Sequence, residues 1–195
     1  MILPIVAYGD PVLRKHCNPV SKDNPELKTI IDNMFETMYK ACGVGLAAPQ
    51  VGLDIRVFIV DTTPFIDNDD FSKEEKKDLD GFKKVFINPT ITNEEGNLWA
   101  FNEGCLSIPD VREDVMRHER LTINYFDENF TEKTEIYDGI RARVIQHEYD
   151  HIEGILFIDK INPLKKRLNQ KRLQNIMDGK ARTDYKMRFF NQKKR

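Results

Sequence analysis

The chain has 195 residues, of which 40% are hydrophobic and 32% are charged, and its formal net charge is −2. This length suits one domain with a hydrophobic core, and no apolar run approaches the roughly 20 residues that a membrane-spanning helix needs. The three cysteines lack the spacing of a disulfide framework and the start lacks the pattern of a signal peptide, so we expect one domain, residues 1–195, in the cytoplasm.

The first predicted element is a helix over residues 25–42. Asn24 suits the N-cap and Pro25 suits the first helical position. Apolar side chains then recur at helical spacing, and Gly43 stands where a glycine commonly ends a helix.

The middle of the chain predicts β-structure. Residues 62–82 are dense in Asp and Lys, and we expect them to form a surface insertion with a short helix over residues 72–79. Turn signals at residues 94–97 and 127–129 divide the apolar and alternating runs on either side. Strands are therefore predicted over residues 55–60, 84–92, 97–101, 121–126 and 131–137.

Helices are predicted again near the C-terminus, over residues 139–153 with Gly154 as the stop, and over residues 163–177. Because strands fill the middle of the chain without a regular alternation of strand and helix, the sequence predicts an α+β fold. We expect antiparallel β-sheets packed around the central helix of residues 139–153, with an N-terminal helix and a C-terminal helix.

The strongest chemical signal is Gln-His-Glu-Tyr-Asp-His at residues 146–151. His147 and His151 are four residues apart, which places both imidazoles on one face of a helix, where they can share a metal ion. Glu148 follows the first histidine, where its carboxylate can contact metal-bound water without ligating the ion. The pattern indicates a metal-dependent hydrolase, although two surface histidines on an ordinary helix would have the same spacing.

A catalytic site of this type usually has three protein ligands, so a third ligand has to come from elsewhere. No histidine follows His151, and the downstream carboxylates, such as those of Asp159 and Asp178, form no recognisable pattern. Upstream, Cys105 offers a thiolate, which is a strong ligand for a divalent ion. A free cysteine is more often a small core residue, but the missing ligand favours Cys105 as the candidate.

Three segments together resemble the peptide deformylase family. They are residues 43–50 (Gly-Val-Gly-Leu-Ala-Ala-Pro-Gln), residues 103–107 (Glu-Gly-Cys-Leu-Ser) and residues 146–151. The start of the chain is also similar to the family, so the resemblance spans about residues 3–160. It implies a single catalytic domain that removes the formyl group from the N-terminal formylmethionine of nascent polypeptides.

The resemblance also implies the metal site and the proton carrier. Cys105, His147 and His151 would ligate the metal, which in this family is commonly Fe²⁺, with Zn²⁺ or Ni²⁺ as substitutes. The metal would lower the pKa of its bound water, and Glu148 would pass a proton from that water to the leaving amine.

The resemblance also implies roles for residues around the metal and the substrate. The Gln50 side-chain amide and the Leu106 backbone N–H would stabilise the developing oxyanion. Asp150 would orient the site from outside the ligand set. Arg143 departs from the family pattern, because apolar residues are frequent at its position. Contacts to the extended substrate and its methionine side chain would come from Gly45, Val44, Phe101, Ile140 and Val144.

The C-terminal segment is strongly basic, unlike the rest of the chain. Residues 160–195 hold 13 basic and 2 acidic residues, so the rest of the chain is acidic. We expect residues 163–195 to form a basic helix and tail that contact the ribosome, since deformylases act on emerging peptides. A solvated helix with a tail that aids solubility fits the same composition. The residues expected to contact ribosomal RNA are Lys165, Lys166, Arg167, Lys171 and Arg172.

Two other functions fit parts of the pattern. A His-Glu-x-x-His endopeptidase would need a third ligand other than Cys105, so replacing Cys105 with Ala would leave its metal binding intact. An inactive scaffold that binds ribosomes would release no formate from a formylated peptide, although every residue required for the chemistry is present.

Overall fold

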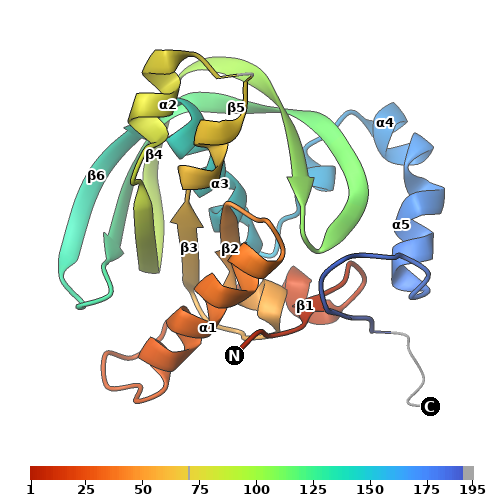
Figure 1. Cartoon of the computed structure of the whole chain (residues 1–195), viewed down its shortest axis with the longest axis horizontal. Helices are drawn as coiled ribbons and strands as arrows, with labels where there is room; N and C mark the ends of the chain where they lie inside the picture. Colours follow the sequence, from red (N-terminus) through yellow and green to blue (C-terminus); the bar gives the residue numbers. More distant parts are fainter. Residues whose placement is uncertain (70, 191–195) are drawn as a thin grey trace.

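A five-stranded antiparallel sheet with the order β2-β3-β4-β5-β6 organises the structure, a computed structural model that describes residues 1–69 and 71–190. Together with the helices described below, this sheet confirms the predicted α+β class with antiparallel pairing. Figure 1 shows β4 and β5 as a long curved pair above the other strands. The strands are β2 (Gly45–Ala47), β3 (Val57–Asp61), β4 (Lys83–Cys105), β5 (Ile108–Phe126) and β6 (Glu132–Asp138).

The β4–β5 pair differs from the sequence prediction. The predicted turn at residues 94–97 is wrong, because β4 continues through it. Gly96 has a φ of +82°, and the pairing register shifts between Glu95 and Leu98, so the turn-like residues form a bulge within the strand. The strand over residues 108–120 was not predicted, since its many charged side chains are exposed and hide the alternation.

The first helix, α1 (Leu27–Lys40), confirms the predicted N-terminal helix but starts later, with Glu26 rather than Asn24 as its N-cap. Its apolar face is buried, with Met34 and Met38 fully covered. Cys42 takes the left-handed conformation at the helix end, with a φ of +55°, in place of the expected Gly43. Gly43 instead packs closely against the next segment of the site: a Cβ there would lie 2.9 Å from the end of the Leu106 side chain, which would have to move.

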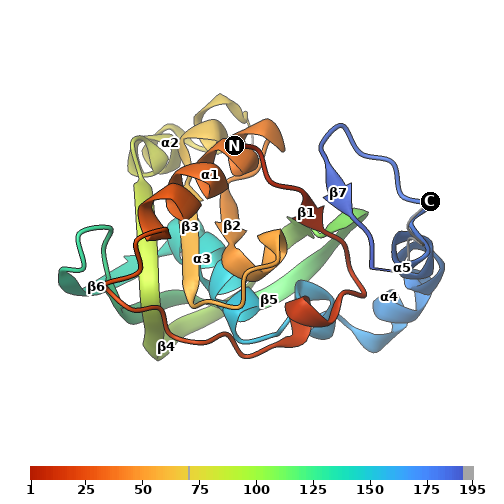
Figure 2. The ribbon, with the colours of Figure 1, turned by 90° about the horizontal axis from the view of Figure 1, so that it is seen from below.

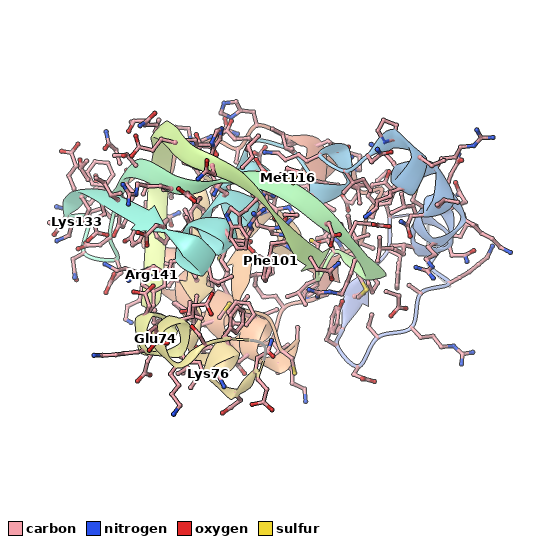
Figure 3. All side chains as sticks on the ribbon, turned by 90° about the horizontal axis from the view of Figure 1, so that it is seen from above. Glu74, Lys76, Phe101, Met116, Lys133 and Arg141 are labelled. Carbon is pink, nitrogen blue, oxygen red and sulfur yellow. The ribbon has the colours of Figure 1, made fainter. Side chains whose placement is uncertain are left out.

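Residues 62–82 contain a 3-10 helix, η3 (Thr63–Asp67), and the short helix α2 (Lys73–Leu79), which confirms the predicted helix. Ser72 caps α2, because its hydroxyl accepts the N–H of Glu75 while the Glu75 carboxylate accepts the N–H of Ser72. Arg141, in the next helix, α3 (Gly139–Ile152), extends toward α2 and pairs with Asp78 (Figure 3). Apolar side chains from this segment also pack on the core: Phe65, Phe71, Leu79 and Phe82.

The central helix is α3 (Gly139–Ile152), which lies in the middle of the molecule in both Figure 1 and Figure 2. It packs against β2, β3 and β5, so nearly all of its faces are buried. Gly154 ends it as predicted, with a φ of +73° and with the backbone of Arg14 only 2.7 Å from where a Cβ would lie. The close contact between Gly154 and the Arg14 backbone therefore holds the C-terminal end of the helix that carries the two histidines.

The predicted helix over residues 163–177 is two helices, α4 (Pro163–Leu168) and α5 (Gln170–Met177). They meet at Asn169, whose buried side-chain amide donates a 2.7 Å hydrogen bond to Glu113 on β5. The apolar periodicity on which the prediction was based does not reveal this break, which lies at a residue in contact with a distant strand.

After α5 the chain turns back, and β7 (Met187–Arg188) pairs in parallel with β1 (Ile5–Val6), as Figure 2 shows. No sequence prediction included this pair. Residues 191–195 of the expected basic tail lie outside the described residues. Within the described part of the chain, no helix is both long and apolar enough to cross a membrane.

Candidate metal centre

Three side chains from two elements meet below the curved β4–β5 pair. His147 and His151 lie one turn apart on α3, with ring centroids 5.1 Å apart and ring planes at 76°. Cys105 is the last residue of β4, and its Sγ lies 3.3 Å from Nε2 of His151. One ligand atom from each residue lies within 4.8 Å of the other two. The structure thus brings together the three residues that the sequence and the family resemblance single out.

This arrangement fits a metal ion. Ligands at ordinary Zn–N and Zn–S bond lengths in a tetrahedral site lie roughly 3.5 Å apart, close to the observed sulfur–nitrogen distance. The two downstream carboxylates weighed as third ligands are engaged elsewhere: Asp159 pairs with Arg14, and Asp178 pairs with Lys180. Cys105 is therefore the third side chain that the fold places where it could complete a metal site with the two histidines.

The Glu103 carboxylate holds His147 in place from behind. It accepts a 2.8 Å hydrogen bond from Nδ1 of His147, which turns Nε2 of the ring toward the metal centre. Glu103 is only 4% exposed. Burial opposes its charge, but hydrogen bonds from His147 and Arg117 outweigh that cost and hold the pKa of Glu103 well below its usual range. The carboxylate therefore stays ionised and fixes the ring orientation.

Two arginines support Glu103. Arg117 donates to both carboxylate oxygens, at 2.7 and 3.0 Å, and also to Asp150 at 2.6 Å. Asp150 in turn pairs with Lys160 at 2.9 Å. The carboxylate at position 150 thus acts on the site through Arg117 and does not reach the metal ligands directly.

Arg143 is the second supporting arginine. It is 2% exposed and donates to Glu103 and to the Val115 carbonyl, both at 3.0 Å, and to the Trp99 carbonyl at 2.7 Å. Its guanidinium also lies 4.3 Å from the centre of the Trp99 ring. Sequence reasoning assigned no role to Glu103, Arg117 or Arg143. The available signal was Arg143 itself, four residues before His147 on a buried helix, where an arginine needs a carboxylate partner.

Glu148 lies beside the proposed ligands and is 4% exposed. Burial raises the pKa of its carboxyl to about 7. Among the described residues, its Oε2 has no hydrogen-bond partner. Oε1 lies so close to Gly45 that a Cβ there would be 2.5 Å away, so a larger residue at this position would displace the carboxylate. A buried carboxylate with a free oxygen is suited to exchange a proton with a bound molecule.

Gln50 faces the metal centre from another direction. Residues 43–50 contain the strand β2 and the start of a 3-10 helix, η2 (Ala48–Val51). The Gln50 side chain is 1% exposed, and its Oε1 accepts the Ala47 N–H at 2.8 Å. This bond fixes the amide, so that Nε2 points toward Cys105 Sγ at 3.4 Å. Leu106, the other expected oxyanion donor, directly follows Cys105 in the chain.

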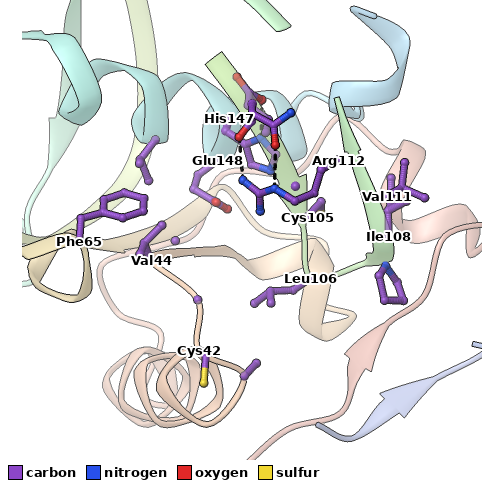
Figure 4. Close-up of a pocket in the computed structure, with 18 of the residues that line it drawn as sticks. Cys42, Val44, Phe65, Cys105, Leu106, Ile108, Val111, Arg112, His147 and Glu148 are labelled. Atoms are coloured by element: carbon purple, nitrogen blue, oxygen red, sulfur yellow. Dashed lines mark hydrogen bonds and ion pairs between the residues drawn. The ribbon is translucent and has the colours of Figure 1, made fainter. Parts of the chain in front are cut away.

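A cavity of about 1060 Å³ opens over these residues. Figure 4 shows His147, Glu148 and Cys105 close together, with Val44 and Phe65 on one side of them. The rim includes residues 182–185, which no sequence prediction placed near the site. All of the residues expected to contact the substrate line it: Gly45, Val44, Phe101, Ile140 and Val144.

Comparisons with known proteins agree with this geometry. The family model described as polypeptide deformylase matches residues 2–167. The chain is 65% identical to a peptide deformylase of Flavobacterium psychrophilum over 194 residues, with both chains fully covered. It is 63% identical to one of Flavobacterium johnsoniae, covering 100% of this chain and 99% of the relative.

Solved structures show the same likeness. A peptide deformylase from Legionella pneumophila is 34% identical with a TM-score of 0.79, and the match covers 94% of this chain and 99% of that one. A second, from Thermotoga maritima, is 37% identical with a TM-score of 0.72, covering 84% of this chain and 99% of the other. The fold and the sequence therefore point to the same group of proteins.

Proposed function

The chain belongs to the polypeptide deformylase family, and we propose that Cys105, His147 and His151 hold its metal ion while Glu148 carries the proton. The family consists of metal-dependent hydrolases, and the reaction of this chain is removal of the N-terminal formyl group from formylmethionine of new polypeptides. The observation that supports the residue assignment is the meeting of the three ligand atoms within 4.8 Å of one another, with Cys105 and His147 lining the cavity.

The donor set narrows the choice of metal. One thiolate and two imidazoles suit borderline transition-metal ions, whereas Mg²⁺ and Ca²⁺ prefer oxygen ligands. We propose Fe²⁺ as the ion in the cell, with Zn²⁺ or Ni²⁺ as substitutes. When bound, the ion supplies Lewis-acid activation of water and of the formyl group.

The residues around this centre stabilise the developing negative charge and transfer the proton. Nε2 of Gln50 and the backbone N–H of Leu106 donate to the formyl oxygen as negative charge develops there. Such preorganised donors typically contribute about 2.7–4 kcal/mol each to transition-state stabilisation. Glu148 takes a proton from the attacking water and returns it to the leaving amine nitrogen, which its buried, unpartnered oxygen allows.

The substrate peptide is proposed to lie along β2. This strand is at the edge of the sheet, so its outer backbone groups can pair with an extended peptide. Gly45 contributes backbone contacts, and the methionine side chain enters the part of the cavity lined by Val44, Phe101, Ile140 and Val144.

A cytoplasmic location and a ribosome contact remain proposals. Nascent polypeptides are the substrate, and basic residues on α4 and α5 suit ribosomal RNA. Lys165 pairs with Glu113 at 3.0 Å and Lys166 with Asp159 at 2.8 Å, so part of this charge is neutralised within the chain. Cosedimentation with ribosomes that does not weaken as salt rises, or that survives neutralisation of Arg167 and Lys171, would contradict the contact.

The test of the site is formate release from a formyl-Met peptide by protein purified anaerobically with Fe²⁺ or Ni²⁺. Glu148→Gln should abolish activity but retain the metal, and Cys105→Ala should lose the metal as well. Cys42→Ala is the matched control, because this exposed thiol also lines the cavity but is not a proposed ligand. Stoichiometric metal in Cys105→Ala, or no formate from the metal-loaded wild type, would overturn the proposal.

A further inference from the structure

The C-terminal strap, residues 181–188, runs from the end of α5 back across the molecule to β1. Its odd-numbered residues are half-buried and its even-numbered residues are exposed. Backbone hydrogen bonds secure its end: the Ile5 N–H donates to the Lys186 carbonyl at 2.8 Å, and the Ala7 N–H donates to the Arg188 carbonyl at 2.9 Å. Figures 1 and 2 both show this return of the chain to β1. The strap is therefore an ordered part of the fold beside the cavity.

The turn after Cys105 needs support from outside itself. Cys105 pairs with Ile108, so Leu106 and Ser107 form a two-residue hairpin turn at the end of β4. Such turns normally have residues with positive φ, which match the twist of the strands. Neither Leu106 nor Ser107 has a positive φ. The turn therefore lacks the conformation that most favours a two-residue hairpin, and the pairing register also shifts between Gly104 and Cys105, so contacts from outside the hairpin can stabilise it.

Two tyrosines from the joined ends of the chain supply those contacts. The Tyr8 backbone N–H donates to the Ser107 carbonyl at 2.8 Å. The Tyr185 hydroxyl donates to the Leu106 carbonyl, also at 2.8 Å. Tyr8 follows β1 and Tyr185 precedes β7, so the β1–β7 pair anchors both contacts. The turn that carries Leu106 is therefore clamped by the strap on one side and by the N-terminus on the other.

We propose that Tyr185 is a positioning residue for the deformylation reaction. Its hydroxyl holds the carbonyl of the Leu106–Ser107 peptide, which restrains the backbone at Leu106 and so limits how far the preceding peptide, whose N–H donates to the formyl oxygen, can turn. This inference rests on the proposed function, because it depends on the role given to Leu106. It adds a part of the site that comes from beyond residue 167, the last residue that the family model matches.

The test is Tyr185→Phe, which removes the hydroxyl but keeps the ring. Loss of one hydrogen bond that holds a transition-state donor should lower kcat about three- to tenfold, with KM and bound metal unchanged. Exchange of the backbone amides in residues 104–108, followed by mass spectrometry on the metal-free protein, should become faster. The matched control is Tyr125→Phe, which removes a buried hydroxyl that donates to Glu135 and is not among the residues lining the cavity.

The outcomes are distinct. Lower kcat and faster exchange at residues 104–108 in Tyr185→Phe, with neither change in Tyr125→Phe, supports the inference. Unchanged kcat and exchange in Tyr185→Phe beside an active wild type overturns the inference alone. An equal fall in kcat in both variants also overturns it, because the effect would then be general destabilisation. A metal-loaded wild type that releases no formate overturns the proposed function first, and this inference with it.

Discussion

Gly45→Ala should disable the enzyme without removing its metal. An added Cβ would lie 2.5 Å from Oε1 of Glu148 and 2.8 Å from its Cγ and Cδ. The carboxylate must then retreat by about 0.9 Å to reach ordinary van der Waals contact. A displacement of about 1 Å in a catalytic group can cost about 100-fold in rate. We therefore expect kcat/KM for a formyl-Met peptide to fall about 100-fold.

The assay is formate release, compared with metal content and with the urea midpoint of unfolding. Overpacking should cost about 1–3 kcal/mol of stability, which leaves the protein folded. Gly81→Ala is the control, because a Cβ there meets nothing within 4 Å and the position lies between α2 and β4. It should lose some stability, owing to its φ of +67°, but keep full activity.

A double-mutant cycle isolates the cause. If Gly45 acts through Glu148, adding Gly45→Ala to Glu148→Ala should change the residual rate hardly at all. A further large loss in the double variant would show that residue 45 acts mainly through the substrate backbone. Retention of kcat/KM within about threefold in the single variant would refute the steric reasoning outright.

Three further predictions concern the supporting residues and the metal. Arg143→Met should lower the free energy of unfolding by about 3 kcal/mol and weaken metal binding about tenfold, because Glu103 loses a buried partner. Urea titration measures the first effect and chelator competition the second. Burial opposes the charge of Asp159, yet hydrogen bonds from Arg14 and Lys166 lower its pKa to about 2. The ionised Asp159 carboxylate therefore stabilises the fold fully above a pH of about 4, and this stabilisation is lost as the pH falls toward 2. The melting temperature of Asp159→Asn should therefore vary less with pH over that range than the melting temperature of the wild type. Removal of the metal with a chelator should lower Tm, and Fe²⁺ or Ni²⁺ should restore it together with formate release.

The sequence predicted those parts of the fold whose signals are local. Helix α3 and its two histidines follow from spacing along one element, and the capping box of α2 lies within four residues. The long β4–β5 pair was missed in part because charged side chains occupy its exposed faces, and Gly96 imitates a turn where the strand only bulges. Local patterns cannot separate these cases, because pairing with the partner strand decides between them.

The residues of the site likewise differ in whether their signal in the sequence is local. His147 and Glu148 could be assigned from one motif, whereas Cys105 lies 42 residues earlier and was favoured only because a ligand was missing. Tyr185 had a weak local signal, the alternation of the strap, but nothing in the sequence tells that the strap returns to β1. Contacts between distant segments depend on the finished fold, so the supporting residues were the ones that sequence reasoning missed.

The buried charges around α3 indicate why these supporting residues are polar at all. Glu103, Arg117, Arg143 and Asp150 are almost fully covered, and their formal charges cancel. Apolar residues of similar volume could pack the same space at equal or better stability, since each buried ion loses its hydration. An apolar core could not accept the Nδ1 hydrogen of His147, so the imidazole would lose its fixed orientation toward Cys105 and His151. The network is best explained by the geometry it imposes on the metal centre, and the stability of the domain comes mainly from its apolar clusters.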